Sequence, residues 1–475
     1  PLWLKIQKEE IQMRNLKRAL SLALAAIMLI GMMVVSASAA SYNNLTDKDE
    51  IVNKDAVSML VSLGIIEGKP DGSYGPTENV DRAQMAKMLS VIMNKGVDNS
   101  ALYQSVNSGL VDVNTNWAKG HINYCYTTGI IAGRGNGKFD PSATVTALEA
   151  AKMLLVAVGY DPAIEGFEGA DWAINVSVRA DEQGIFEGFT KDLSAPLNRD
   201  DAALLIYNAL DVEMIQSYTT NNYPIAYSDH RTILADKYGV IKVQGVVVAN
   251  EWASLASDDG DAALKEGKTT IYNGEGIFST TGNTTVSKED ASLKTQTFNV
   301  STPVDMLGKT VNLYIKKTTI LADSTVYGDP VVSDVNTVVT TGETVLYSGA
   351  KDPQVDYDKL LGENGLTDKD AKYFWNYNSG KYIPNTTEKY GDKTANVKGA
   401  TLTIIDNNGD GEVDYVLSVE KALADITSVN SKKETVTVRT LGTLDNKDVV
   451  GYEDMAKEDV VLYVQYGGRT YLEKP

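Results

Sequence analysis

Two arginines stand where their side chains could bind an anion. Arg82 follows Asp81 and Arg199 follows Asn198, and Asp and Asn are residue types that cap the N-termini of helices. The free N–H groups and the dipole of a helix start favour negative charge, and a guanidinium binds a carboxylate through two parallel hydrogen bonds. An arginine at either position could therefore bind an acidic ligand. The alternative for each arginine is a solvent-exposed residue at the start of a helix.

A second candidate site is the acidic run from Asp406 to Asp414. Its oxygen-bearing residues match positions 1, 3, 5 and 9 of a calcium loop, and these are Asp406, Asn408, Asp410 and Asp414. Gly411 matches the glycine of position 6, but Leu417 stands where a bidentate Glu is expected. The alternative is a β-hairpin whose Asn and Asp side chains form Asx turns. The sequence requires no cofactor, and it offers calcium as a candidate ligand of this loop.

The sequence contains no recognisable catalytic motif, and we expect that the protein is not an enzyme. Its two histidines are His121 and His230, and no nucleophile motif lies beside either. We predict that His121 lies on a solvent-facing helix surface and that Cys125, the one cysteine, is a buried core thiol. The abundant carboxylates leave a glycosidase-like pair open, although scattered Asp and Glu are expected on an acidic surface.

The two arginines belong to a unit that recurs three times. It opens at Gly64, Gly129 and Gly184 and closes on a helix start, whose second residue lies 18, 18 and 15 positions later. Apolar residues then follow in the same helical phase: Met85, Met88, Leu89 and Ile92; Ala150, Met153, Leu154 and Ala157; Ala202, Leu205, Ile206 and Ala209. A phase match across three copies indicates an internal repeat, which dictates the architecture.

Each unit predicts two helices joined by a Gly/Pro-rich loop. The opening Gly is a C-cap, because glycine tolerates the left-handed conformation that ends helices. The second helix begins at a capping residue with Gln, Glu or Asp three positions later. These pairs are Asp81 with Gln84, Thr146 with Glu149, and Asn198 with Asp201. The first two are capping-box patterns and the third is a looser variant.

These features resemble the S-layer homology (SLH) repeat of bacterial surface proteins. The resemblance rests on the Gly-Ile-Ile turns, the loops 70–76 and 135–141, the helix starts, and Trp117-Ala118 and Trp172-Ala173. Each of these tryptophans precedes its Gly by 12 positions, a place that Val52 holds in the first copy. The resemblance covers about residues 45–215, with copies at about 45–94, 110–160 and 171–214.

The resemblance implies non-covalent anchoring to a secondary cell-wall polysaccharide that carries pyruvate ketals. In this family the Arg of the helix start is thought to bind the polymer in grooves between neighbouring repeats. Carried over, the candidate polysaccharide-binding residues are Asp81, Arg82, Trp117, Trp172, Asn198 and Arg199. The two tryptophans are sugar-stacking or core groups, and we expect core packing. The second copy departs from the pattern, because Ala147 replaces its Arg.

The N-terminal segment resembles a secretion signal. Residues 1–12 precede the first Met and are interpreted as upstream and non-native, and residues 13–40 form the predicted signal peptide. It has a positive start, an apolar run over 19–35 and a small-x-small cleavage site, Ala37-Ser38-Ala39. The alternative is a membrane anchor, which needs about 20 apolar residues. We expect removal of the segment and no membrane contact afterwards.

The charge of the chain limits its partners. The formal net charge is −19, and removal of residues 1–40, which carry +3, leaves −22. Such an acidic protein is not expected to bind nucleic acid. An acidic wall polymer would be repelled as well, so its binding requires local cationic pockets. With one cysteine no internal disulfide can form, as in a secreted protein that does not rely on disulfides.

The fold class predicted is multidomain, with a mainly α domain of three SLH repeats (41–218) followed by all-β, sandwich-like modules. Beyond residue 218 alternating Val, Thr and Tyr replace helical spacing. Strands are predicted at 243–248, 310–315, 331–339, 401–405, 413–419, 435–438 and 460–464. We divide this part into a β-rich module (219–350), a polar connecting region (351–395) and a β-rich module (396–475) that ends as a truncated module would.

The expected function is that of an extracellular surface protein of a Gram-positive-type bacterium, located in the cell wall or S-layer. The repeats would anchor it, and the β part would be structural and self-associate into a surface lattice. The alternative is a wall-anchored enzyme or polysaccharide-binding protein whose active domain lies in or beyond the β region.

Overall fold

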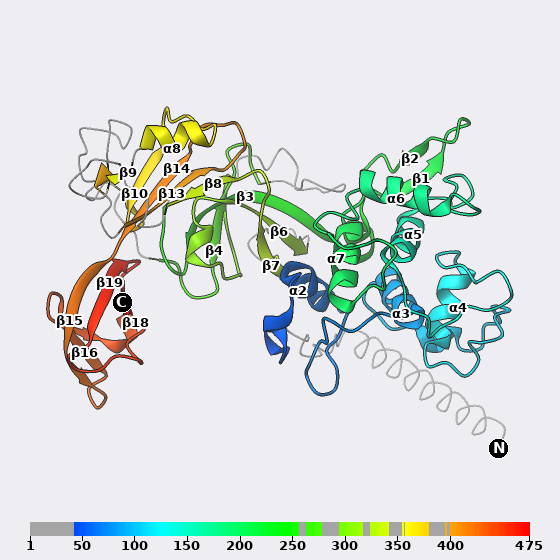
Figure 1. Ribbon diagram of the computed structural model, residues 1–475, viewed down its shortest axis with the longest axis horizontal. Helices are drawn as coiled ribbons and strands as arrows, with labels where there is room; N and C mark the ends of the chain where they lie inside the picture. Colours follow the sequence, from blue (N-terminus) through cyan, green and yellow to red (C-terminus); the bar gives the residue numbers. More distant parts are fainter. Residues whose placement is uncertain are drawn as a thin grey trace, which may run out of the picture.

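The structure is a computed structural model that describes residues 42–255, 263–277, 294–316, 324–341, 354–355, 357–379, 395–396 and 400–475. The predicted upstream segment and signal peptide lie outside these ranges. Within them, no helix has the length and apolar character needed to cross a bilayer. Helices occupy the N-terminal part and β-sheets the rest (Figure 1). The predicted order, a helical region followed by β-sheet regions, is confirmed.

The helical region contains three pairs of helices. They are α2 (Lys54–Ser62) with α3 (Arg82–Met93), α4 (Lys119–Thr127) with α5 (Ala147–Val158), and α6 (Trp172–Glu182) with α7 (Arg199–Leu210). Short 3-10 turns occur at η1 (Tyr42–Asn44), η2 (Lys48–Glu50) and η3 (Ser100–Tyr103). The loop in each pair spans the Gly/Pro-rich stretch, so the predicted helix–loop–helix units are present.

The predicted helix boundaries are confirmed by their hydrogen bonds. The Asp81 carboxylate accepts the Gln84 N–H at 2.7 Å, and the Gln84 side chain accepts the Asp81 N–H at 3.0 Å. Thr146 and Glu149 form the same reciprocal capping box. Asn198 caps α7 without the return bond. The opening glycines 64, 129 and 184 have φ of 69°, 77° and 69°, the left-handed conformation that a C-terminal glycine supplies.

The three units are joined in a ring by backbone hydrogen bonds. The N–H of Val80 donates to Leu197 O at 2.8 Å, that of Val145 to Val80 O at 3.0 Å, and that of Leu197 to Val145 O at 2.8 Å. All three residues are buried. Around this ring α3 packs on α4, α5 on α6, and α7 returns to α2. The units are therefore related by a pseudo-threefold axis, and each first helix packs on the second helix of the preceding unit.

Two five-stranded sheets follow. The first has the antiparallel order β5 (Thr295–Phe298), β4 (Thr269–Tyr272), β3 (Val240–Asn250), β6 (Thr310–Lys316) and β7 (Val326–Val332). The second has the order β11 (Asn378–Ser379), β10 (Lys372–Trp375), β14 (Tyr415–Glu420), β13 (Ala400–Asp406) and β8 (Thr337–Thr340). In the second sheet β10 runs parallel to β14 and the other pairs are antiparallel.

The two sheets form a sandwich. Val243 and Leu313 of the first sheet share a core with Phe374, Ile405 and Leu417 of the second. The opposite face of the second sheet packs under α8 (Tyr357–Glu363). Because side chains alternate along a strand, β13 serves both cores.

A third sheet lies at the C-terminus and has its own core. Its order is β17 (Gly442–Asp445), β16 (Thr435–Val438), β15 (Ala422–Asn430), β19 (Val460–Tyr466), β20 (Arg469–Glu473) and β18 (Val449–Val450). Two-stranded pairs are β1 (Ile215–Tyr218) with β2 (Pro224–Ala226), and β9 (Gln354–Val355) with β12 (Ala395–Asn396). Single turns of helix occur at η4 (Leu234–Tyr238), η6 (Val304–Met306) and η9 (Asn446–Asp448).

The predicted organisation of the β part differs from the structure in two ways. The strand predicted over 331–339 is broken, because β7 ends at Val332 and β8 begins at Thr337 in a different sheet. The predicted connecting region 351–395 contributes α8, β10 and β11 to the sandwich. The sheets therefore do not follow the predicted boundaries, since the second sheet takes strands from 219–350, 351–395 and 396–475.

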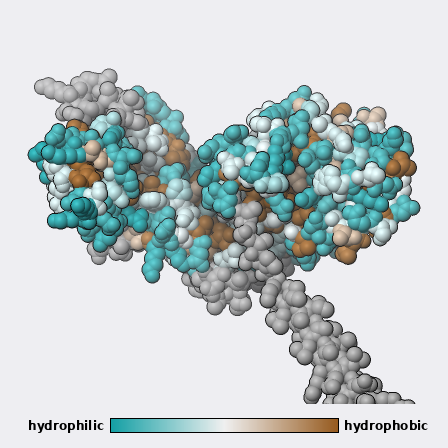
Figure 2. Space-filling view, turned by 90° about the horizontal axis from the view of Figure 1, so that it is seen from below, coloured by the Kyte–Doolittle hydropathy of each residue, from teal (hydrophilic) through white to brown (hydrophobic). Residues whose placement is uncertain are grey.

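The helical region packs directly on the sandwich. Figure 1 shows α2 beside β7, and Gly328 of β7 approaches so closely that a Cβ there would lie 3.2 Å from Met59 Cα. Ser58 Oγ donates to Asp329 at 3.2 Å, and the Tyr207 hydroxyl donates to that of Tyr314 at 3.0 Å. The surface in Figure 2 is mostly hydrophilic, with apolar residues in small groups.

Candidate functional site

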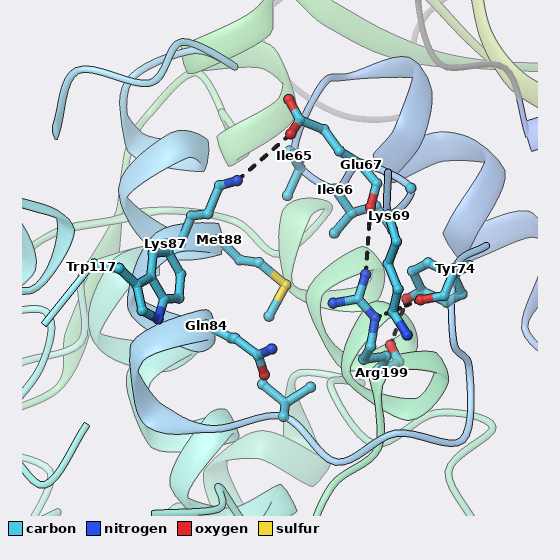
Figure 3. Close-up of a pocket in the computed structure, with 12 residues that line it drawn as sticks. Ile65, Ile66, Glu67, Lys69, Tyr74, Gln84, Lys87, Met88, Trp117 and Arg199 are labelled. Atoms are coloured by element: carbon cyan, nitrogen blue, oxygen red, sulfur yellow. Dashed lines mark hydrogen bonds and ion pairs between the residues drawn. The ribbon is translucent and has the colours of Figure 1, made fainter. Parts of the chain in front are cut away.

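Two grooves lie between the helical units. Groove 1 has a volume of about 220 Å³, and its main lining residues are Glu67, Lys69, Tyr74, Lys87, Trp117 and Arg199 (Figure 3). Groove 2 has a volume of about 480 Å³, and its main lining residues are Arg82, Ala132, Arg134, Glu149, Lys152 and Trp172. The structure thus brings Arg199 together with Trp117, and Arg82 together with Trp172.

The two grooves are equivalent under the pseudo-threefold axis. The corresponding pairs of residues are Arg199 and Arg82, Trp117 and Trp172, Lys87 and Lys152, Lys69 and Arg134, and Tyr74 and Phe139. In each groove the arginine comes from one unit, the loop and the lysine from the next, and the tryptophan from the third. Each groove therefore exists only when all three units are packed together.

Arg82 is buried, with 4% of its surface exposed. Its Nε donates to Phe139 O at 2.8 Å, its Nη2 donates to Ala132 O at 2.9 Å, and the guanidinium lies 4.4 Å from the Phe139 ring centroid. Among the described residues Nη1 has no hydrogen-bond partner. Burial, reinforced by Arg134, lowers the pKa of Arg82 to about 10, so it stays charged at neutral pH. The alternative of a solvent-exposed helix start is wrong for Arg82, because its guanidinium is bound to the loop of the next unit.

Arg199 repeats this geometry in groove 1 and is half-buried. Its Nε donates to Tyr74 O at 2.8 Å, its Nη2 donates to Glu67 O at 3.5 Å, and it lies 4.8 Å from the Tyr74 ring centroid. The Tyr74 hydroxyl donates in return to Arg199 O at 2.7 Å. Within the described ranges Nη1 is again without a hydrogen-bond partner. Each arginine is thus oriented by two carbonyls and keeps one nitrogen for a ligand.

The tryptophans face the grooves. Trp117 is 59% exposed and lies opposite Arg199 in Figure 3, so the core packing predicted for it is wrong. Trp172 is half-buried and contacts the helical core. Lys152 Nζ lies 5.7 Å from its ring centroid and donates to Phe167 O at 2.5 Å. An exposed indole face beside a cation is suited to a sugar that carries a negative charge.

Each groove carries three cationic residues in a chain whose net charge is −19. In groove 1 Lys87 Nζ lies 3.7 Å from Glu67, and Lys69 pairs with Glu78. In groove 2 Arg134 pairs with Glu149 at 2.7 Å. These lysines and Arg134 were not among the predicted site residues, although a cation recurs at each of these places in the first two repeats.

The third equivalent position lacks both key residues. Ala147 replaces the arginine and is buried, and Val52, which is 82% exposed, replaces the tryptophan. The Asn208 amide donates to Glu187 O at 2.9 Å, the carbonyl equivalent to the one that Arg82 binds in Ala132. The carbonyl that an arginine would bind here is thus already paired.

A model of the S-layer homology domain matches residues 44–86 and 111–151. The chain contains S-layer homology domains. The matches cover the loop and the helix start of the first two units. The third unit shares their geometry but lies outside the matched residues.

Several related proteins are named as bacterial surface or S-layer proteins. A cell surface protein of Thermoanaerobacter kivui is 28% identical over 270 residues, which are 56% of this chain and 32% of that protein. An S-layer protein of Bacillus licheniformis is 33% identical over 24% of this chain and 12% of its own. A surface-layer 125 kDa protein of Lysinibacillus sphaericus is 23% identical over 83% and 31%. The chain spans about a third or less of these relatives, and it is a cell-surface protein related to S-layer proteins.

Asp81 and Asn198 do not line either groove of the SLH region. Their side chains accept the N–H groups of Gln84 and Asp201, both at 2.7 Å. They therefore fix the helix starts from which Arg82 and Arg199 extend, and the structure gives them no position from which to contact a groove ligand.

The acidic run lies in the hairpin between β13 and β14. Asp406 is buried, and its carboxylate accepts the N–H groups of Asn408, Gly409 and Gly411 at 3.1, 2.7 and 2.9 Å. Asp414 accepts the Asn407 N–H at 2.8 Å. These are the Asx turns of the hairpin alternative. Nowhere in the described ranges are three or more His, Cys, Asp or Glu residues gathered in a way that could hold a metal ion.

Two further predictions concern the residues of α4. His121 is buried, with 4% exposure, so the predicted solvent-facing position is wrong. Cys125 is buried as predicted, and burial raises the pKa of its thiol. The helical spacing of the sequence could not predict that His121 is buried, because the hydrogen-bond partners of this residue lie outside α4.

Proposed function

We propose that the helical region, α2 to α7, anchors the protein non-covalently to the cell wall by binding an acidic secondary cell-wall polysaccharide in grooves 1 and 2. The observation that carries the proposal is the pairing, in each groove, of a preoriented arginine with an indole from a different unit. A carboxylate can accept from the remaining Nη1 of the arginine and from the nearby lysine. A sugar ring can then lie against the tryptophan.

The charge distribution supports an acidic ligand. The chain as a whole repels anions, so cations concentrated in two grooves favour an anionic polymer only at those places. A pyruvate ketal, the substituent implied by the family, supplies one carboxylate at a sugar ring. Two grooves on one anchor also allow one polymer to bind twice, which strengthens attachment without new contacts.

The β-sheets are proposed to be structural and to self-associate into a surface lattice, with no catalytic role and with calcium as a candidate ligand. The relationship to S-layer proteins supports this assignment. The isolated chain is expected to form ordered two-dimensional arrays in electron micrographs. A chain that stays monomeric at high concentration and hydrolyses wall polysaccharide would instead support a wall-anchored enzyme.

Co-sedimentation with purified cell walls tests the anchor. The chain is expected to sediment with walls that carry their secondary polymer and to stay in solution with walls stripped of it. Trp117→Ala combined with Trp172→Ala is expected to release most of the protein. Val52→Ala is the matched control, because Val52 holds the same place in the third unit. Equal binding by the folded tryptophan variant would refute the groove assignment.

A further inference from the structure

A buried histidine lies directly behind the tryptophan of groove 1. His121 lies on α4, four residues after Trp117, which precedes the N-cap Ala118 of that helix, and the two ring centroids are 6.4 Å apart with the rings edge to face. Trp117 is exposed in the groove and His121 is buried behind it. A buried imidazole therefore lies beside an indole that is exposed to a ligand in the groove.

The surroundings of His121 accommodate both of its protonation states. Nδ1 lies 2.5 Å from Ser90 Oγ and Nε2 lies 3.6 Å from Asp98, while Ser90 Oγ is also 3.0 Å from Lys87 O. With neutral imidazole, the hydroxyl donates to Nδ1 and the Nε2 hydrogen faces Asp98. With imidazolium, Nδ1 donates to Ser90 Oγ and the hydroxyl turns its hydrogen to Lys87 O. Rotation of one hydroxyl thus pairs every group in either state.

The charged groups that act on His121 are Asp98 and Lys87. Burial lowers the pKa of His121, Asp98 opposes this shift, and Lys87 reinforces it. Asp98 lies in the loop that leaves α3, and Lys87 lies on α3 and lines groove 1. An anion bound beside Lys87 would add a second negative group near the imidazole and favour its charged form.

Groove 2 has no equivalent of the pair formed by His121 and Ser90. The position equivalent to His121 is Val176 and the position equivalent to Ser90 is Leu155, and both are fully buried. The positions of the histidine and the serine are therefore apolar in groove 2, and Lys152, which lies near Trp172, donates to Phe167 O. The same chain thus contains one groove with a histidine beside its tryptophan and one groove without such a histidine.

We propose that His121 is a positioning residue of groove 1, and that its protonation strengthens the binding of an anionic sugar between Lys87, Arg199 and Trp117. The inference rests on the proposed function. Protonation places a positive charge behind Trp117 and removes none of the hydrogen bonds that hold α4 on α3. Groove 1 therefore binds more tightly in mildly acidic surroundings, while groove 2 keeps a constant affinity.

The test uses the full chain with Trp172→Ala, which weakens groove 2, and a synthetic hexosamine that carries a pyruvate ketal. Calorimetry at about pH 5 and about pH 7.5 samples either side of the ordinary pKa of a histidine, about 6.5, and carboxylates of this kind stay ionised at both. Affinity is expected to be about threefold to tenfold higher at the lower pH, the effect of one added charge near a partly exposed site. Equal affinity at the two pH values overturns the proposal.

Two variants distinguish the effect of the charge on His121 from the structural effect of its side chain. His121→Gln keeps a neutral hydrogen-bonding side chain, and it is expected to bind at both pH values as the parent does at the higher one. His121→Val with Ser90→Leu copies the groove 2 pair and is expected to give the same flat profile. The Trp117→Ala chain, which binds through groove 2, supplies the reference. A flat variant profile with a pH-dependent parent supports the proposal, and a pH-dependent variant profile overturns it.

The histidine titration is read independently by NMR, because the chain has only His121 and His230. The ring signals of His121 are expected to titrate without loss of the fold, and the probe is expected to raise their midpoint, because binding and protonation are linked. A ring that stays neutral until the protein unfolds overturns the proposal. If the parent chain binds neither walls nor probe at any pH, the proposed function itself fails, which is a distinct result.

Discussion

The guanidinium of Arg82 lies 4.4 Å from the ring centroid of Phe139, although the two residues belong to different repeats. Its Nε donates to the carbonyl of the same Phe139, and its Nη2 donates to Ala132 O. Through these contacts Arg82 links the first two units, and it also lines groove 2. Loss of the side chain should therefore act on stability and on binding together.

Arg82→Ala is expected to lower the free energy of unfolding by about 2 to 4 kcal/mol, because hydrogen bonds to a charged group contribute about 1.5–3 kcal/mol each and two carbonyls would be left unpaired. Denaturant unfolding followed by circular dichroism measures the change. Arg134→Ala, which removes an exposed ion pair with Glu149, is the control and should cost less than about 1 kcal/mol. Equal stability of the two variants would contradict the structural role of Arg82.

The local features of the helical region could be predicted from sequence, whereas the partners of its side chains could not. Asp81 and Gln84 are three residues apart, so their capping box is visible in the sequence. Arg82 is buried by a loop whose bonded residues lie 50 and 57 positions later in the chain, and no local sequence pattern indicates that contact. The pairing of Arg199 with Trp117 likewise depends on the closed ring of units, which follows from backbone bonds at Val80 and its equivalents.

In the β part, too, contacts between residues distant in the sequence could not be predicted. Alternation predicted the segments of β3, β6 and β13, because each has a buried face. It could not show that Val332 and Thr337 belong to different sheets, since both segments have strand-like composition. The turn between them is fixed by Asn336, which bonds to Thr310 on a neighbouring strand.

Acid is expected to weaken the two groove loops through Asp47 and Asp112. Asp47 accepts the N–H groups of Tyr74 and Gly75, both at 2.7 Å, and Asp112 accepts those of Phe139 and Asp140 at 2.9 and 2.8 Å. Partial burial raises the pKa of each carboxyl, but these donors outweigh it and the pKa is lowered in both.

Because these folded-state pKa values lie below the unfolded value of about 3.9, the stabilisation is present above that pH and is lost as the pH falls through the folded-state pKa. Melting temperature is therefore expected to fall below about pH 4. Asp47→Asn with Asp112→Asn should melt lower at neutral pH and lose less on acidification. Asp181→Asn, at an exposed position on α6, should behave as the parent. An unchanged acid profile in the double variant would contradict the assignment.

Variants in the hairpin at Asp406 distinguish the two interpretations of the acidic run, a calcium loop and a hairpin with Asx turns. Because Asp406 accepts three backbone N–H groups, Asp406→Ala is expected to lower the melting temperature with or without calcium. Asp410 is exposed and accepts only the Glu412 N–H among the described residues, so Asp410→Ala should have little effect without calcium. If the loop binds calcium, the parent melts higher with the ion and Asp410→Ala abolishes the rise. No rise in the parent would leave the Asx-turn hairpin as the whole explanation.

Arg199 allows the contribution of an arginine to wall binding to be measured with the least disturbance of the fold. It is half-buried, and its second bond, to Glu67 O, is long at 3.5 Å. Arg199→Ala is expected to weaken wall binding roughly tenfold to a hundredfold, since a hydrogen bond to a charged group contributes about 1.5–3 kcal/mol and 1.4 kcal/mol is a factor of ten. Arg199→Lys should restore binding only in part, because an ammonium lacks the planar fork of the guanidinium.

Binding of the Arg199 variants is measured by wall co-sedimentation over a range of wall concentrations, with circular dichroism to establish folding. Arg231→Ala is the matched control, because Arg231 is a half-exposed arginine that pairs with Asp229 and lines neither groove. A folded Arg199→Ala chain with unchanged affinity would remove the arginine from the binding site. Groove 1 would then act through Trp117 and Lys87 alone, and Trp117→Ala would be the variant that releases it.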